Sequence, residues 1–109
     1  MRLYLSGPIT GTDDYKLRFR RAKMELAAAG YTNVVNPAEL DGVLPVEQME
    51  WDEIMTICID LLAGCDALIL MDGWEQSRGC NREVGYAQGA DLIVVPLDEM
   101  LISRGGVTI

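Results

Sequence analysis

The sequence of 109 residues contains no histidine. This absence excludes nucleophile systems that pair serine or cysteine with histidine, and it excludes metal sites built on imidazole ligands. Cysteine is also scarce, because Cys58, Cys65 and Cys80 form no CxxC pair and their odd number does not fit a disulfide framework. We therefore expect reduced thiols and a cytoplasmic protein.

Long apolar runs are missing as well, and basic residues are outnumbered by acidic ones. No stretch reaches the roughly 20 apolar residues of a membrane-spanning helix, and residues 1–7 enter a strand pattern without the core of a signal peptide. Nine basic residues against 17 acidic ones give a formal net charge of −8. This balance argues against a nucleic-acid polymer or an anionic membrane as partner, but it permits a small anion held by local groups.

The residues that are present predict one α/β domain over residues 1–109. Half of them are hydrophobic, which is enough for a core, although a domain of this size gains stability from an oligomer. Short apolar runs alternate with helical patterns, and this alternation predicts a parallel sheet with helices on both faces. The expected strands cover 2–5, 31–35, 67–71 and 92–95. The first expected helix begins at a cap formed by Thr12 or Asp13 and ends at Gly30. Further helices are expected over 46–62, over 78–88, where Gly89 ends the helix, and over 98–103. Residues 104–109 are expected to form a loop or a short strand.

Three loops follow strands of this predicted sheet, at 6–11, 36–40 and 72–79. Ligands of such folds bind outside the carboxyl ends of the strands, so we expect these loops to converge on one site. In the first loop, two glycines allow close backbone approach and two residues add hydroxyls, but the pattern matches neither a dinucleotide nor a P-loop fingerprint. A simple tight turn explains it equally well. The residues concerned are Ser6, Gly7, Thr10 and Gly11.

The third loop leads into a helix that Ser77 is placed to cap. The first amides of that helix would face a ligand, and Gly79 leaves space in front of them. Glu83 lies four residues after Gly79 and shares its face of the helix. A ligand whose phosphate is bound at these amides could therefore present its sugar to Glu83. Spacing alone leaves open whether Glu83 is reactive or an ordinary solvated acid.

Aromatic residues give weaker signals. Tyr4, in the first strand, is placed either to orient a reactive carboxylate or to pack in the core. Trp51 and Trp74 either stack on a base or pack against their neighbours. Asp66 lies at the opposite end of its strand, where we expect a role in a turn.

The motifs together resemble a known superfamily over nearly the whole chain. They are Tyr4-Leu5-Ser6-Gly7-Pro8, Asn36-Pro37-Ala38-Glu39, Cys65-Asp66-Ala67, and the stretch from Gly73-Trp74-Glu75-Gln76-Ser77-Arg78-Gly79 to Glu83-Val84-Gly85-Tyr86-Ala87. The sequence is similar to the nucleoside 2-deoxyribosyltransferase-like superfamily, and most similar to a small, often phage- or prophage-borne branch. The resemblance implies a flavodoxin/Rossmann-like three-layer sandwich with a 4–5-stranded parallel sheet.

The resemblance also implies an activity, namely cleavage or exchange of the N-glycosidic bond of nucleosides or nucleotides. Glu83 would attack C1′ of the sugar to form a covalent glycosyl-enzyme, and Tyr4 would place that carboxylate. Such chemistry needs no metal and no organic cofactor. Members commonly assemble, so a homodimer or larger homo-oligomer is expected, through apolar residues of the second helix and the tail at 104–109.

Ser77 narrows the implied substrate. Transferases of the superfamily that act on free nucleosides carry an acid six residues before the nucleophile, whereas the nucleoside 5′-monophosphate N-glycosidases carry serine, as here. A phosphate is thus expected at Ser77, Arg78 and Gly79, with the pocket completed by Ser6, Gly7, Ile9, Thr10 and Gly11.

The sequence departs from the resemblance at Cys58, where many relatives carry an aspartate that contacts the sugar or base. A non-catalytic nucleotide-binding or sensing protein on the same fold is therefore the alternative function.

Overall fold

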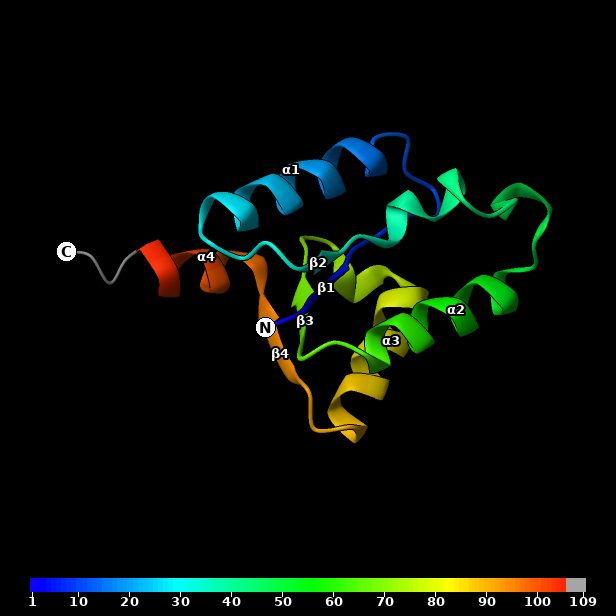
Figure 1. The fold of residues 1–109 in the computed structure, drawn as a ribbon. Helices are drawn as coiled ribbons and strands as arrows, with labels where there is room; N and C mark the ends of the chain where they lie inside the picture. Colours follow the sequence, from blue (N-terminus) through cyan, green and yellow to red (C-terminus); the bar gives the residue numbers. More distant parts are fainter. Residues whose placement is uncertain (106–109) are drawn as a thin grey trace.

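The computed structural model describes residues 1–105 and contains one sheet of four parallel strands (Figure 1). The strand order is β2-β1-β3-β4, so the two central strands are β1 and β3, and every residue of both is buried. Burial on both faces explains why these strands read as continuous apolar runs. The strands are β1 (Leu3–Ser6), β2 (Val34–Val35), β3 (Ala67–Leu70) and β4 (Ile93–Pro96).

Helices cover both faces of the sheet. In Figure 1, α1 and α4 lie on one side of the strands and α2 and α3 on the other. This is the flavodoxin/Rossmann-like three-layer sandwich, and the predicted fold class is confirmed. The helices are α1 (Tyr15–Ala28), α2 (Trp51–Ala63), α3 (Arg78–Gly89) and α4 (Leu97–Gly105). None of those in residues 1–105 is both long and apolar enough to cross a bilayer.

The alternation of side chains along β1 divides the core into two parts. Leu3 and Leu5 pack with Phe19 of α1 on one face, whereas Tyr4 packs with Cys58 of α2 on the other. Since successive side chains of a strand point to opposite faces, Ser6 shares the face of Tyr4. The strand therefore directs two hydroxyls towards α3.

The predicted helix over 46–62 is wrong at its start. A short 3₁₀-helix covers Val46–Gln48, and α2 begins only at Trp51. The reason is a capping box: the Glu50 side chain accepts from the Glu53 backbone, and the Glu53 carboxylate accepts from the Glu50 amide at 2.9 Å. Reciprocal capping fixes the first turn there, and Met49 is extended.

Four smaller boundaries also differ from the predictions. Asp14, rather than Thr12 or Asp13, occupies the N-cap position of α1. The strand predicted over 31–35 pairs only at Val34–Val35. Gly89 belongs to α3, and the left-handed conformation after that helix falls on Asp91, with φ of 59°. Of the predicted tail at 104–109, residues 104–105 belong to α4 and 106–109 lie outside the described residues.

Candidate functional site

Glu83 is a buried carboxylate in the second turn of α3, and only 6% of its surface is exposed. Its Oε2 accepts a hydrogen bond from the hydroxyl of Tyr4, and its Oε1 accepts one from Ser6 Oγ at 2.8 Å. Both donors come from β1, and both are almost completely buried. The sheet and the helix thus hold one carboxylate by both of its oxygens.

The electrostatics of this cluster depend on burial. Burial raises the pKa of Glu83, while the hydrogen bonds from Tyr4 and Ser6 oppose that rise because they stabilise the ionised carboxylate. Burial and the adjacent Glu83 charge raise the pKa of Tyr4 well above its usual value. Tyr4 therefore keeps its proton at neutral pH and acts as a donor to Glu83.

Two buried thiols flank the carboxylate. Cys58 of α2 interacts with the Tyr4 hydroxyl, and Cys80 of α3 interacts with the hydroxyls of Ser6 and Ser77. Burial raises the pKa of both thiols, with the Glu83 charge acting in the same direction. Neither thiol is in a disulfide, and both remain protonated at neutral pH.

A cavity of about 150 Å³ opens directly onto Glu83. Its walls come from β1, the loop after β1, the segment after β2, the start of α2 and the N-terminus of α3, so the three predicted loops do converge. Glu83 is the single carboxylate among the lining residues. These are Tyr4, Leu5, Gly7, Ile9, Thr10, Pro37, Trp51, Ile54, Met55, Cys58, Ser77, Gly79, Cys80 and Glu83.

Most of the predicted site residues line this cavity, but three do not. Ser6 lies behind Glu83 and acts on it by a hydrogen bond. Gly11 is exposed, at φ of 80°, with nothing near its Cα that a side chain would meet. Arg78 is exposed, and its guanidinium lies over the ring of Trp51, 3.9 Å from the centroid.

Ser77 caps α3 as predicted. Its Oγ accepts from the backbone amide of Cys80 at 3.2 Å, which satisfies one of the free amides of the first turn. Asn81 fixes the same junction, because its side-chain amide donates to the carbonyls of Glu75 and Ser77. Gly79 lies between them and keeps the approach to the cavity open.

Trp51 joins α2 to α3 at the edge of the cavity. The guanidinium of Arg82 lies 5.4 Å from the centroid of the Trp51 ring, and that of Arg78 lies 3.9 Å from it. Both distances are within the range of cation–π attraction. Arg82 also pairs with Asp52 at 3.4 Å. Trp51 thus forms an aromatic wall of the cavity that carries both arginines, and its stacking on a base stays a prediction. Trp74 is half-buried and packs against core residues that include Val84 and Ala87 of α3.

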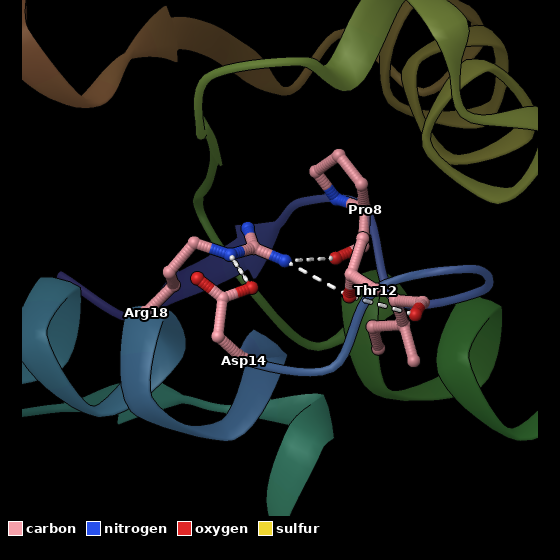
Figure 2. Close-up of polar contacts among 5 residues, drawn as sticks. Pro8, Thr12, Asp14 and Arg18 are labelled. Carbon is pink, nitrogen blue, oxygen red and sulfur yellow. Dashed lines mark hydrogen bonds and ion pairs between the residues drawn. The ribbon is translucent and has the colours of Figure 1, made fainter.

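Arg18 holds the first loop in place, a role that was not predicted from the sequence. Figure 2 shows its guanidinium donating to the carbonyl of Pro8 at 2.9 Å, to Thr12 Oγ1 at 3.1 Å and to Asp14 at 3.0 Å. Thr12 Oγ1 in turn donates to the carbonyl of Ile9. The only signal in the sequence was an arginine four residues after an aspartate within a basic helix, which is a common surface pattern.

Close contacts fix the other end of this loop. A Cβ on Gly7 would lie 3.0 Å from Met71 Sδ and 3.3 Å from Phe19 Cζ, so the backbone approaches the core closely there. Gly73 adopts φ of 85° in the third loop, and a Cβ on it would lie 3.2 Å from Pro8. The first and third loops therefore pack directly against each other.

The apolar lining residues Ile54 and Met55 of α2 were not predicted as part of the site, because an apolar residue that lines a cavity and one that fills a core give the same pattern in sequence. The predicted turn role of Asp66 is replaced by a long-range one. Its carboxylate accepts from the backbone amide of Arg2 at 2.7 Å, which links the starts of the paired strands β1 and β3. Within residues 1–105, no three histidine, cysteine, aspartate or glutamate side chains are grouped to hold a metal ion.

Comparison with known proteins complements this geometry. No curated protein matches the chain. A family described as "Domain of unknown function (DUF4406)" matches residues 1–96, which include all four strands of the described part of the chain and the residues that line the cavity. The chain belongs to this family.

Proposed function

We propose that the protein cleaves or exchanges the N-glycosidic bond of nucleoside 5′-monophosphates through a covalent glycosyl-Glu83 intermediate. The observation that carries the proposal is the buried Glu83 carboxylate, held by Tyr4 and Ser6, at the base of a cavity whose rim includes the capped N-terminus of α3. The resemblance to nucleoside 2-deoxyribosyltransferase-like proteins supports these roles for Glu83 and Tyr4, whereas the role of Ser6 in holding the carboxylate is inferred from its hydrogen bond alone.

The chemistry follows from this arrangement. A Glu83 oxygen attacks C1′ of the sugar, the C1′–N bond breaks, and its electron pair leaves with the base, which takes up a proton from water. Water then attacks C1′ of the ester and returns the free carboxylate, or a second base does so in a transfer. Burial disfavours the charged carboxylate and thereby increases its tendency to form the ester, while Tyr4 and Ser6 keep it oriented.

The phosphate is assigned to the N-terminus of α3. Backbone amides and the positive end of the helix favour an anion there, and Ser77 and Gly79 line the cavity at that point. Arg78 follows Ser77 directly, although its guanidinium covers Trp51. No aspartate or glutamate other than Glu83 lines the cavity, so no fixed negative charge at the rim opposes a phosphate.

The direct test is incubation with nucleoside 5′-monophosphates and the matching nucleosides, followed by chromatography for free base. We expect release from the monophosphates, loss of release in Glu83→Gln with binding retained, and a protein adduct with the mass of the sugar phosphate in acid-quenched wild type. Normal turnover by Glu83→Gln would show that Glu83 is not the nucleophile.

A matched pair at Ser77 separates capping from phosphate binding. Ser77→Asp keeps an N-cap but adds a charge that repels phosphate, whereas Ser77→Ala loses the cap, at about 1 kcal/mol, and adds no charge. Weaker nucleotide binding in Ser77→Asp than in Ser77→Ala, with nucleoside binding unaffected, is expected. Equal effects of the two variants would argue against a phosphate there.

A nucleotide-binding protein without catalysis is the second candidate. The observation that favours it is Cys58, which places a buried thiol in the cavity where the resemblance leads us to expect an acid. Tight monophosphate binding without base release from any substrate would support this candidate over the first.

A further inference from the structure

A second cavity, of about 210 Å³, adjoins the one at Glu83. Four residues line both cavities, namely Ile9, Pro37, Ile54 and Cys58. The first cavity alone is smaller than the roughly 300 Å³ at the lower end of small-molecule sites, whereas the two together exceed that size. A ligand that reaches Glu83 therefore has an adjacent space for its remainder.

The walls of this second cavity are mainly apolar. Beyond the shared residues they come from the start of α1 and from the two short helices between β2 and α2, η1 (Pro37–Gly42) and η2 (Val46–Gln48). The charged groups are both acidic and exposed, and no lysine or arginine is among the lining residues. The residues that line this cavity but not the first are Tyr15, Ala38, Leu40, Asp41, Val46 and Glu47.

The charges at the rim of the second cavity favour a neutral ligand over an anionic one. The Asp41 carboxylate forms an ion pair with Lys16, and Glu47 adds a second negative charge. Because Lys16 compensates the charge of Asp41, the uncompensated charge among the lining residues is the Glu47 carboxylate, which disfavours an anionic group. We therefore assign the phosphate to the α3 side of the first cavity. A flat, neutral, largely apolar group matches this lining.

Cys58 stands where the two cavities meet. It is buried, lines both, and interacts with the Tyr4 hydroxyl that holds Glu83. Because burial raises the pKa of its thiol, this junction carries no charge at neutral pH. If a sugar is bound at Glu83, a neutral ring attached to it can therefore extend past the uncharged Cys58 thiol into the second cavity.

We propose that the second cavity is the aglycone site, which binds the neutral ring of a glycoside by shape and apolar contact. This inference rests on the proposed function and adds a statement about specificity. The lining holds few polar groups, so it does not read the hydrogen-bonding edge of one particular base. Sites that fit by apolar contact discriminate by about 10- to 200-fold, whereas sites that pair with substrate polar groups reach 10⁴-fold or more.

The first test uses the wild-type protein and the 5′-monophosphates of adenine, guanine, cytosine and thymine deoxynucleosides. We expect dissociation constants, and kcat/KM values where base is released, to differ by less than about 100-fold across the four. A preference above about 10³-fold for one base would overturn the proposal, because it would require specific polar readout.

The second test fills the cavity with Val46→Trp, since Val46 is half-buried and lines only the second cavity. The matched control is Val43→Trp on the same segment, because Val43 is 78% exposed and lines neither cavity. Calorimetric titration in a Glu83→Gln background, with thermal unfolding as a check on folding, compares each nucleotide with ribose 5-phosphate, which has no aglycone.

We expect Val46→Trp to weaken nucleotide binding at least tenfold while leaving ribose 5-phosphate within twofold, and Val43→Trp to change neither. Equal weakening of both ligands, or none, would overturn the aglycone site. The two proposals can fail separately. If no substrate releases base, the proposed catalytic function is wrong, but a loss of binding in Val46→Trp that affects nucleotides and not ribose 5-phosphate would still support the aglycone site. Absence of binding by all of these ligands to the wild-type protein would overturn both proposals.

Discussion

The hydroxyl of Tyr4 on β1 donates a hydrogen bond to Oε2 of Glu83 on α3, across 79 residues of sequence. Ser6, two residues further along the same strand, donates to the other carboxylate oxygen at 2.8 Å. One strand therefore positions both oxygens of a buried acid, and the surrounding burial raises its pKa.

Removal of the Tyr4 hydroxyl by Tyr4→Phe should raise the pKa of Glu83 further, because the hydrogen bond that lowers it is lost. We expect kcat/KM for base release to fall about 10- to 100-fold, since a hydrogen bond to a charged group contributes roughly 1.5–3 kcal/mol. The acidic limb of the pH–rate profile should move to higher pH. Tyr86→Phe on α3 serves as the control, and an unchanged profile in Tyr4→Phe would contradict the positioning role.

Glu83 should also make the fold less stable as the pH rises. A carboxyl whose pKa is raised in the native state binds more protons there than in the unfolded chain, so stability falls with pH from the ordinary value of 4.5 upwards through the native pKa. Glu83→Gln should therefore be more stable than wild type at pH 7, and this difference should shrink below pH 4.5. Urea unfolding across this range measures it. Glu75→Gln, at an exposed acid, should lack the effect.

Two glycine substitutions should change stability in opposite directions. Gly7→Ala places a Cβ 3.0 Å from Met71 Sδ and 3.1 Å from Met71 Cβ, and this overpacking should cost about 1–3 kcal/mol. Gly85→Ala in the middle of α3 meets nothing within 4 Å and should add about 0.5–1 kcal/mol through helix propensity. Free energies of unfolding in urea test the pair, and a neutral Gly7→Ala would contradict the close packing.

Loss of the Arg18 guanidinium should loosen the first loop. Arg18→Ala removes the bonds to Pro8, Thr12 and Asp14, which secure the segment that carries Ile9 and Thr10 into the cavity. We expect roughly tenfold faster amide hydrogen exchange over residues 9–12, equivalent to about 1.4 kcal/mol of local stability. Arg18→Lys should restore part of the protection. Arg20→Ala, at an exposed residue of the same helix, should leave the loop unchanged.

The fold class could be predicted because its signals are local. Continuous apolar runs at β1 and β3 require a sheet covered on both faces, and the helical stretches between them supply the cover. The N-cap role of Ser77 was equally local, since it depends on a side chain and an amide three residues apart. The start of α2 was misplaced because apolar periodicity continues through 46–50, where the capping box of Glu50 and Glu53 decides the boundary.

Local patterns in the sequence are sufficient to predict a parallel α/β sandwich, three converging loops and a glutamate one turn beyond a capped helix start. The groups that surround this glutamate depend on long-range packing. The pairing of β1 with β3 and the packing of α3 on that face bring Tyr4 and Ser6 to its two oxygens. They also bring Cys58 to the wall shared by two cavities, and clamp the first loop through Arg18. These contacts join residues distant in sequence or act through loop backbone, so no local pattern encodes them.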